Sequence, residues 1–327
     1  MGAGKTAFVT GGTGFLGMNL VEQLCAAGWE VTVVHRASSN LTRVKQFPVA
    51  FAVSDLLDRE AMEAAVPEGV DAVFHVAGNI SMWDARAEEQ MRDNLEGTKC
   101  VLAAATAKGA KRLVYTSSWA TYGLGDRALT EESEQLGAQS PRAYARSKYL
   151  AEQEVKAAVG EGLPGVIINP PHIVGRYDRS GWGRTVRMMK AGKAPAAPPG
   201  SGCFCHSVEV ARAHIAAAER GRAGENYLLG GVNATLEEVF AVIAALVGRK
   251  PPPVAPAWAL RAMGRLGVMV AGVTRKEPDL TPAGAFIVTS KPSIVSDKAK
   301  RELGFEAVDL TTMFTDARDW MEAEGLL

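Results

Sequence analysis

A glycine-rich turn near the N-terminus constrains the fold of this chain more than any other stretch. It spans residues 10–17 and lies between the apolar run 7–9 and the amphipathic run 18–27. This order predicts a strand, a tight turn and a helix. A strand that turns directly into a helix aims free backbone N–H groups and the positive end of the helix dipole at one point. The turn therefore predicts an anion site, with a phosphate as the expected anion.

Three glycines of the turn have separate physical roles in this prediction. Gly11 permits the tight turn, Gly14 lets a diphosphate approach the backbone, and Gly17 lets the helix pack closely on the strand. An ordinary glycine-rich turn is the alternative, but the flanking patterns are those that a dinucleotide site requires. The residues expected to contact the cofactor here are Gly11, Thr13, Gly14, Phe15, Leu16 and Gly17.

The overall charge of the chain does not recruit a polyanion. Its 327 residues include 36 Lys and Arg against 36 Asp and Glu, so no net field attracts nucleic acid or a membrane surface. We therefore expect a small-molecule ligand and no nucleic acid. The length suits one large domain with an additional lobe.

The cysteines indicate a reducing compartment. There are four, at positions 25, 100, 203 and 205, which is too few and too irregular for a disulfide framework. We expect a cytoplasmic protein without a metal site, because Cys203 and Cys205 lack a second pair of ligands. No transmembrane segment is expected either, since the most apolar run, 254–273, contains Arg261 and Arg265.

The rest of the chain alternates strand and helix patterns. Strands are predicted over 30–34, 47–53, 71–76, 113–118 and 166–168, and helices over 58–65, 87–108 and from Ser140 onward, where a hydroxyl precedes a proline. This alternation predicts an α/β fold, a doubly wound parallel sheet covered on both faces. Ligands then bind at the carboxyl ends of the strands.

One residue at the end of the second strand favours a particular cofactor. Arg36 lies 19 residues after Gly17, where an acidic side chain would hold a ribose hydroxyl and an arginine would accept a 2′-phosphate. Ser38, Ser39 and Arg43 follow closely. The position favours NADP(H), although NAD(H) is not excluded because Arg36 also suits a solvated strand end.

A tyrosine and a lysine supply a candidate acid and base. Tyr144 and Lys148 are four residues apart and share one face of the predicted helix. A phenol has an ordinary pKa of about 10, and an adjacent ammonium favours its ionised form. The pair therefore predicts proton transfer near the end of the 113–118 strand.

Further motifs follow in order along the chain. After the 10–17 turn come the Asp55 turn, 94–98, 115–118 with Tyr122-Gly123, 144–148, 170–175 and 296–305. Together they resemble the ordered motif set of the extended short-chain dehydrogenase/reductase family. The resemblance covers nearly the whole chain.

The resemblance implies a Rossmann-type domain over 1–170, to which 203–226 returns, and a smaller α/β substrate lobe over 171–202 and 227–327. It also implies a homodimer formed through helices at about 87–108 and 142–158. The catalytic residues that it implies are Ser118, Tyr144 and Lys148, with Asn94 either in a proton relay or in a packing role. The further cofactor contacts that it implies are Asp55, Leu56, Ala77, Gly78, Lys148, Pro170 and Ile173.

Within this family the chain most resembles the branch of dihydroflavonol reductases and 3β-hydroxysteroid dehydrogenases. His172 stands where nucleotide-sugar enzymes usually have an asparagine, and Trp119 follows Ser118 where those enzymes favour small residues. Asn169 replaces an arginine expected in many relatives. We expect Trp83, Trp119 and His172 to line the substrate pocket, with core packing as the alternative for each.

The predicted activity is NADP(H)-dependent oxidoreduction of a carbonyl and an alcohol on a bulky hydrophobic substrate. Apolar patches in the lobe support it, including the amphipathic run 258–273, for which packing, substrate cover and peripheral membrane contact all stay open. The alternatives are a nucleotide-sugar epimerase or dehydratase with tightly bound NAD and a non-catalytic cofactor sensor. The sensor would be expected to lack the Tyr144 and Lys148 pair, which is present.

Overall fold

A seven-stranded parallel sheet forms the centre of the computed structural model, which describes residues 4–123 and 125–327. Its strand order is β10-β7-β5-β4-β1-β2-β3, and every neighbouring pair is parallel. The strands are β1 (Thr6–Thr10), β2 (Glu30–His35), β3 (Val49–Val53), β4 (Ala72–His75), β5 (Leu113–Thr116), β7 (Gly165–Asn169) and β10 (Asn226–Leu228). The predicted fold class is confirmed.

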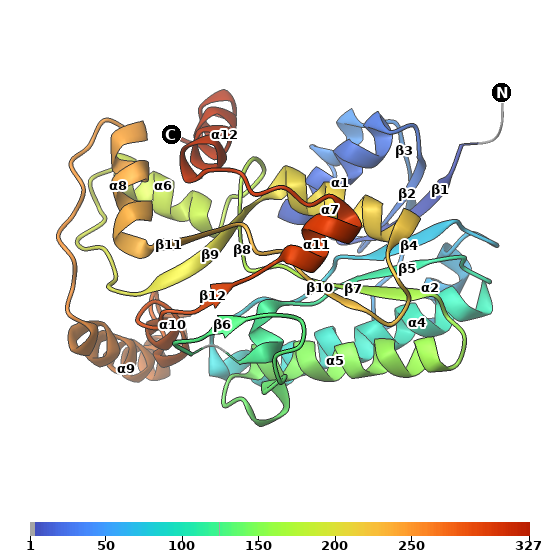
Figure 1. Cartoon of the computed structure of the whole chain (residues 1–327), viewed down its shortest axis with the longest axis horizontal. Coiled ribbons are helices and arrows are strands. Elements are labelled where there is room, and N and C mark those ends of the chain that lie inside the picture. Colours follow the sequence, from blue (N-terminus) through green and yellow to red (C-terminus); the bar gives the residue numbers. More distant parts are fainter. Residues whose placement is uncertain (1–3, 124) are drawn as a thin grey trace.

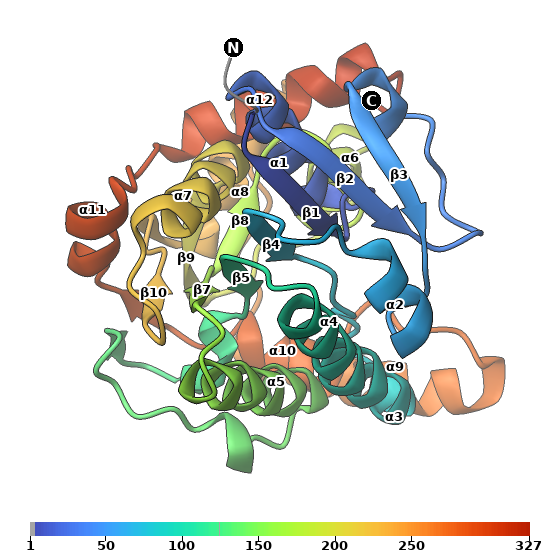
Figure 2. The same ribbon diagram turned by 90° about the vertical axis from the view of Figure 1, so that its right-hand side faces the viewer.

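Helices cover both faces of this sheet, as Figure 2 shows. One face carries α1 (Phe15–Ala26) and α7 (Ser207–Arg220), and the other carries α2 (Arg59–Ala65), α4 (Gly97–Ala107) and α5 (Ala143–Gly160). The strands are therefore buried on both sides, which explains why β5 and β7 are continuous apolar runs rather than alternating ones. The strand order reverses between β1 and β4, so the ligand crevice expected of such a sheet lies at their carboxyl ends.

The helix predicted over 87–108 is interrupted. It consists of α3 (Ala87–Met91), a π-helical turn at Arg92–Glu96, and α4. The extra residue of the turn has a tertiary cause, because the Asn94 side chain bonds to the backbone of Asn79 and to Ser147. Such π-turns occur frequently at functional sites.

The helix that carries Tyr144 begins later than its sequence suggests. It starts at Ala143 after an Arg142 N-cap that has no side-chain cap bond. Ser140 is therefore not the cap that the sequence predicted. Its hydroxyl accepts a hydrogen bond from Arg142 N at 3.2 Å and closes a local turn before the helix instead.

A smaller sheet forms the centre of the second lobe (Figure 1). Its order is β11-β9-β8, with β8 and β9 parallel and β9 and β11 antiparallel. The strands are β8 (His172–Val174), β9 (Ser201–His206) and β11 (Val232–Thr235), and the helices that pack in its core are α6 (Trp182–Lys190), α8 (Leu236–Leu246) and α12 (Leu310–Ala323).

The remaining elements connect or flank these layers. They are β6 (Ala128–Leu129), paired with β12 (Ser293–Ile294), the helices α9 (Ala257–Thr274), α10 (Pro282–Ile287) and α11 (Asp297–Leu303), and 3₁₀ turns at Val44–Gln46, Asp84–Arg86, Trp119–Tyr122 and Gly137–Gln139.

Strand pairing does not follow the predicted domain division residue by residue. The strand β9, which includes 203–206, pairs in the smaller sheet, whereas β10 extends to Leu228 in the main sheet. The core beside α1 and α7 also contains Ala299, Leu303 and Phe305 from the C-terminal part of the chain. The division into 1–170 with 203–226, and 171–202 with 227–327, remains a prediction.

Candidate active site

The glycine turn joins β1 to α1 by a very close approach of backbone atoms. Gly11 has φ +72°, a left-handed conformation that favours glycine. A Cβ built on Gly17 would lie 2.0 Å from the carbonyl oxygen of Gly11, so no larger residue fits there without moving the backbone. These two positions therefore fix where α1 begins relative to β1.

The N-terminus of α1 suits a phosphate. Its N-cap, Gly14, is exposed and provides no side-chain cap, and the first turn contains no acidic residue. A Cβ on Gly14 would meet one atom within 4 Å, the carbonyl oxygen of Gly11 at 3.3 Å, so its outer side is open. Thr13 and Phe15 are half-buried beside it, whereas the Leu16 side chain packs in the core. Leu16 can therefore contribute its backbone N–H to a ligand.

Arg36 lies at the end of β2 with its side chain exposed. Within residues 4–123 and 125–327 its guanidinium has no ion-pair partner, which leaves it available to an anion. Arg43 is different, because it pairs with Glu324 and lies over the Trp320 ring. Of the two arginines, Arg36 is therefore the better candidate for a 2′-phosphate.

Two further predicted residues follow β3 on the same edge of the sheet. Asp55 is exposed, and its carboxylate accepts a hydrogen bond from Leu57 N at 3.0 Å. Leu56 is half-buried against α4, where a Cβ on Gly97 would lie 3.3 Å from it. Both residues are close to the turn that ends β3, as an adenine contact would require.

A chain of hydrogen bonds links the end of β4 to the π-turn. Ala77 N donates to Thr10 Oγ1 at 3.2 Å, and Thr10 Oγ1 lies 2.8 Å from His75 Nδ1. On the other side of the ring, His75 Nε2 lies 3.0 Å from Thr98 Oγ1, which donates to Asn94 O at 2.6 Å. The interior between β1 and α4 is thus held by polar bonds as well as by packing.

The π-turn and the 77–79 segment meet beside Lys148. A Cβ on Gly78 would lie 3.4 Å from Asn94 Oδ1 and 3.7 Å from Lys148 Nζ. Asn94 Oδ1 accepts from Asn79 N, and its Nδ2 donates to Asn79 O and to Ser147 Oγ. Asn94 therefore ties the β4 end to the helix that carries Lys148.

Ser118, Tyr144 and Lys148 come from two elements that converge. Ser118 follows β5, and its hydroxyl accepts from Ala120 N at 3.2 Å, while Tyr144 and Lys148 lie on the first turns of α5. Burial raises the pKa of Tyr144, and the neighbouring Ser118 hydroxyl opposes this shift. The structure therefore brings the predicted serine and tyrosine close together.

Lys148 is buried on the same face of α5. Its ammonium donates to Thr116 O at 2.6 Å and lies 4.5 Å from the centre of the Tyr115 ring. Burial lowers its pKa from an ordinary 10.5 to about 7, and the charge of Glu152 acts in the opposite direction. A buried lysine whose pKa is lowered in this way is typical of a functional site.

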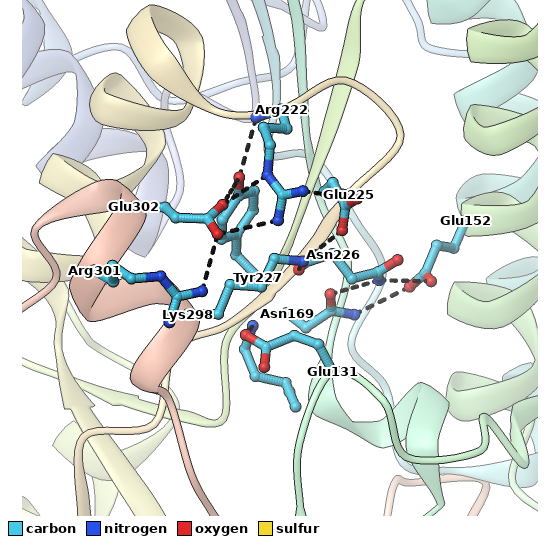
Figure 3. Close-up of polar contacts among 11 residues, drawn as sticks. Glu131, Glu152, Asn169, Arg222, Glu225, Asn226, Tyr227, Lys298, Arg301 and Glu302 are labelled. Carbon is cyan, nitrogen blue, oxygen red and sulfur yellow. Dashed lines mark hydrogen bonds and ion pairs between the residues drawn. The ribbon is translucent and has the colours of Figure 1, made fainter.

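Glu152, which the sequence analysis missed, bonds α5 to the neighbouring strands, and Figure 3 shows its contacts with Asn169 and Asn226. It lies one turn after Lys148, and its side chain is fully buried. Its carboxylate accepts hydrogen bonds from Ser117 Oγ (2.7 Å), Gln135 Nε2 (2.6 Å), Asn169 Nδ2 (3.0 Å) and Asn226 Nδ2 (2.8 Å) and pairs with Lys156 (3.0 Å). The same i, i+4 spacing that joins Tyr144 to Lys148 continues to Glu152 and could have revealed it.

An aromatic group lies next to Ser118. His172 stacks on Phe204, with ring centres 5.1 Å apart, and Trp119 and Trp182 meet the His172 ring edge-on at 5.3 and 5.5 Å. Burial lowers the pKa of His172 to about 4, so the ring is neutral near pH 7. The structure therefore joins two of the three predicted pocket residues in one aromatic cluster, called the apolar wall below. Trp119 and Phe204 are buried core residues in it, so the pocket role of these rings stays a prediction.

The other predicted residues lie around this wall. Trp83 is half-buried in the segment after β4, and no ring contact joins it to the wall within the described residues. Pro170 is buried and accepts a hydrogen bond from Trp119 N at 3.2 Å, and Ile173 is a half-buried residue of β8. Both lie where β7 continues into the lobe.

In 4–123 and 125–327 no three His, Cys, Asp or Glu side chains are arranged to hold a metal ion. Across the same residues, none of the helices has the length and apolar content needed to cross a membrane.

Comparison with known proteins identifies similar chains. Residues 7–230 match the model of the NAD dependent epimerase/dehydratase family. The chain is 31% identical to a Synechocystis protein named "Putative dihydroflavonol 4-reductase", covering 97% of this chain and 95% of the relative. It is 30% identical to "Sterol demethylase protein B" of Methylococcus capsulatus, covering 98% and 100%.

A solved structure shares the whole fold. The crystal structure of gox2253 superimposes with a TM-score of 0.85 at 30% sequence identity and covers 99% of both chains. The similarity therefore includes the smaller sheet and the helices around it, not the dinucleotide-binding part alone.

The buried carboxylate yields a stability prediction. Glu152→Gln should destabilise the fold by about 2–4 kcal/mol, because the new amide nitrogen would face donors that now bond to a carboxylate. Urea unfolding measures the change. Glu154→Gln, at a half-exposed neighbour on the same helix, is the control and should change stability by at most about 0.5 kcal/mol. Equal effects of the two substitutions would contradict the positioning role.

The depressed pKa of Lys148 yields a pH prediction. Folding lowers this pKa from 10.5 to about 7, so between these values the unfolded chain binds a proton that the folded chain does not. Burial of the ammonium therefore lowers the free energy of unfolding by its full amount below about pH 7. This loss disappears as the pH rises toward 10.5. Relative to wild type, Lys148→Met should gain stability at low pH and lose that gain on going to high pH.

Urea unfolding across this pH range measures that difference. Lys45→Met, at an exposed lysine, is the control and should show a difference from wild type that does not vary with pH. A pH-independent difference for Lys148→Met as well would show that the ammonium is not destabilised by burial.

Proposed function

The chain belongs to the NAD dependent epimerase/dehydratase family, and on this premise we propose that it is an NADP(H)-dependent oxidoreductase that interconverts a carbonyl and an alcohol on a bulky hydrophobic substrate. The family and the named relatives make it an oxidoreductase that uses a nicotinamide cofactor. The observation that carries the finer proposal is the convergence of Ser118, Tyr144 and Lys148 beside an apolar aromatic wall.

In this proposal Tyr144 is the proton donor in the reductive direction. Burial raises its pKa and keeps the phenol protonated, which a proton donor requires. Ser118 donates a hydrogen bond to the same substrate oxygen and stabilises the charge that develops there. When bound, the nicotinamide supplies or accepts the hydride.

Lys148 has two roles in the proposal. It binds the hydroxyls of the nicotinamide ribose, and its charge favours the ionised tyrosine when the reaction runs toward oxidation. Its position next to Gly78 and below the Tyr115 ring leaves it close to the 77–79 segment where the ribose is expected. Asn94 is proposed as a positioning residue, because each of its side-chain polar atoms already bonds within the protein.

Residues at the carboxyl edge of the sheet are proposed to hold the rest of the cofactor. The open N-terminus of α1 binds the diphosphate through backbone N–H groups. Arg36 would bind the 2′-phosphate, Asp55 and Leu56 would contact the adenine, and Pro170 and Ile173 would contact the carboxamide. The guanidinium of Arg36, which is exposed and has no ion-pair partner among the described residues, supports NADP(H) over NAD(H).

The substrate side of the proposal rests on the apolar wall. Trp119 and Phe204 are buried and contact the half-buried rings of His172 and Trp182. These rings carry no charge near pH 7, which suits an aromatic or sterol-like molecule rather than a diphosphate. Two relatives carry names that refer to such compounds, a dihydroflavonol and a sterol.

The alternative function is a nucleotide-sugar epimerase or dehydratase with tightly bound NAD, which the description of the matching family includes. The two functions differ in cofactor turnover. An epimerase returns its cofactor to the starting state in every cycle, whereas an oxidoreductase consumes NADPH in proportion to product. Incubation with NADPH and a hydrophobic ketone, followed by quantification of both, distinguishes them.

A homodimer through α4 and α5 is proposed on the family resemblance alone. The two helices pack side by side on one face of the sheet (Figure 2). Light scattering should give twice the mass of one chain, and the mass of one chain would exclude the dimer.

Cofactor preference tests the role of Arg36. Wild-type protein should bind NADPH more tightly than NADH in a tryptophan fluorescence titration, and Arg36→Asp should weaken NADPH binding by about 10–100-fold while changing NADH binding little. Lys45→Asp, an equal charge change at an exposed lysine nearby in the sequence, is the control. Equal binding of both cofactors by the wild type would reject the NADP(H) assignment.

Proton transfer tests the role of Tyr144. Tyr144→Phe should lower kcat by about 10²–10⁴-fold because the acid is lost, while NADPH affinity stays within about twofold. Tyr149→Phe, on the next turn of the same helix, is the control and should retain activity. Full activity of Tyr144→Phe would remove the tyrosine from the mechanism.

A further inference from the structure

The helix α9 contacts the rest of the protein through one narrow face. Of its 18 residues, Gly264 and Ala271 are buried. A Cβ on Gly264 would lie 2.9 Å from Thr281 O, and one on Gly267 would lie 2.7 Å from Leu280 O. The helix therefore rests on the segment before α10 through its small residues, and its larger side chains are not needed to pack the lobe.

The opposite side of α9 is apolar and exposed. Trp258 is 73% exposed, Leu266 57%, Met269 65% and Val273 87%. At 3.6 residues per turn these four side chains fall on one stripe along the helix. We refer to them as the outer stripe. Figure 1 shows α9 at the edge of the molecule, with α10 as its neighbour. Such a stripe marks a surface that binds something apolar.

The charged residues of α9 itself are both basic. The helix contains Arg261 and Arg265 and no acidic residue, and Arg275 and Lys276 follow it directly. The acidic residues that come next already have partners, because Glu277 bonds to Ser81 and Asp279 pairs with Arg184. Within the described residues, Arg261, Arg265, Arg275 and Lys276 take part in no ion pair. The helix therefore combines an exposed apolar stripe with two arginines along one edge and two cations just beyond its C-terminal end, all four without an ion-pair partner in the part of the chain that the structure describes.

We propose that α9 docks on the surface of an anionic lipid bilayer, with the outer stripe in the interface and the cations among the headgroups. An interfacial helix with an apolar face, basic edges and a tryptophan has this composition. Each lysine or arginine near an anionic surface contributes favourably to binding. A second copy of the chain fits the surface less well, because a symmetric pair would bring the same cations of both copies together.

The position of α9 connects this surface to the candidate active site. Just after the helix, Glu277 accepts a hydrogen bond from Ser81, in the segment that follows β4 (3.3 Å). In α10, the Phe286 ring lies 4.8 Å from the guanidinium of Arg142, two residues before Tyr144. Docking through α9 therefore brings the bilayer to the side of the molecule that carries these segments, with α9 and α10 between the bilayer and Tyr144. On the proposed function, this gives an apolar substrate dissolved in lipid a short path to the site.

Vesicle flotation of the full chain tests the docking. Wild-type protein should float with vesicles of equimolar phosphatidylcholine and phosphatidylglycerol and should bind at least about tenfold less to vesicles of phosphatidylcholine alone, and added salt should weaken the binding. No flotation with the anionic vesicles would overturn the proposal.

Two variants test the surface itself. The triple variant Leu266→Ser, Met269→Ser and Val273→Ser should bind anionic vesicles at least about tenfold less, because three apolar side chains leave the interface. The double variant Arg261→Gln and Arg265→Gln should lose most of the preference for the anionic vesicles. A matched control, Val53→Ser, Leu57→Ser and Val295→Ser, changes three exposed apolar side chains outside α9 and should bind as wild type does. Undiminished binding of the α9 triple variant would refute the docking.

Two readouts separate the remaining outcomes. If light scattering shows that the triple variant halves the mass of the protein, and vesicles are not bound, the outer stripe covers a second copy and the proposal fails. Reduction of a water-soluble ketone should be the same in the triple variant and the wild type. Vesicle binding without any ketone reduction would reject the proposed function and leave the docking standing.

Discussion

The carboxylate of Glu152 is the interaction on which the geometry of the site depends. Through this carboxylate, α5 is hydrogen-bonded to three strands of the main sheet. The partners are Ser117 just after β5, Asn169 at the end of β7 and Asn226 at the start of β10. Ser118 follows one of these groups directly, and Lys148 lies one turn before the carboxylate. The buried carboxylate of Glu152 therefore determines how far Ser118 lies from Tyr144, because it bonds the helix of the tyrosine to the residue before the serine. Protein groups satisfy the hydrogen bonds of this carboxylate.

The parts of the molecule that the sequence predicts well are those determined by short spacings. Residue 17 must be glycine because it lies against the backbone of Gly11, only six residues earlier in the same strand–turn–helix unit. Tyr144 and Lys148 share a face of their helix because they are four residues apart. The continuous apolar runs of β5 and β7 predict buried parallel strands for the same local reason.

The parts that the sequence does not predict depend on distant partners. The π-turn exists because Asn94 bonds to Asn79 and Ser147, and the role of Glu152 depends on partners as far away as Asn226. For α9, periodicity identifies an apolar stripe but not its direction. The structure shows that Gly264, Gly267 and Ala271, rather than the large side chains, face the protein.

The hydrogen-bond chain through His75 has a consequence for proton placement. Thr98 gives its hydroxyl proton to Asn94 O and therefore accepts from His75 Nε2, so the ring carries its proton there and Nδ1 accepts from Thr10. Burial and the charge of Lys148 lower the pKa of His75 to about 3, so the ring stays neutral. With this single tautomer, every hydrogen bond in the chain donates in the same direction, from the amide of Ala77 to the carbonyl of Asn94. A charged ring would carry a proton on Nδ1 as well, so Thr10 could no longer donate to it and the chain would be interrupted there.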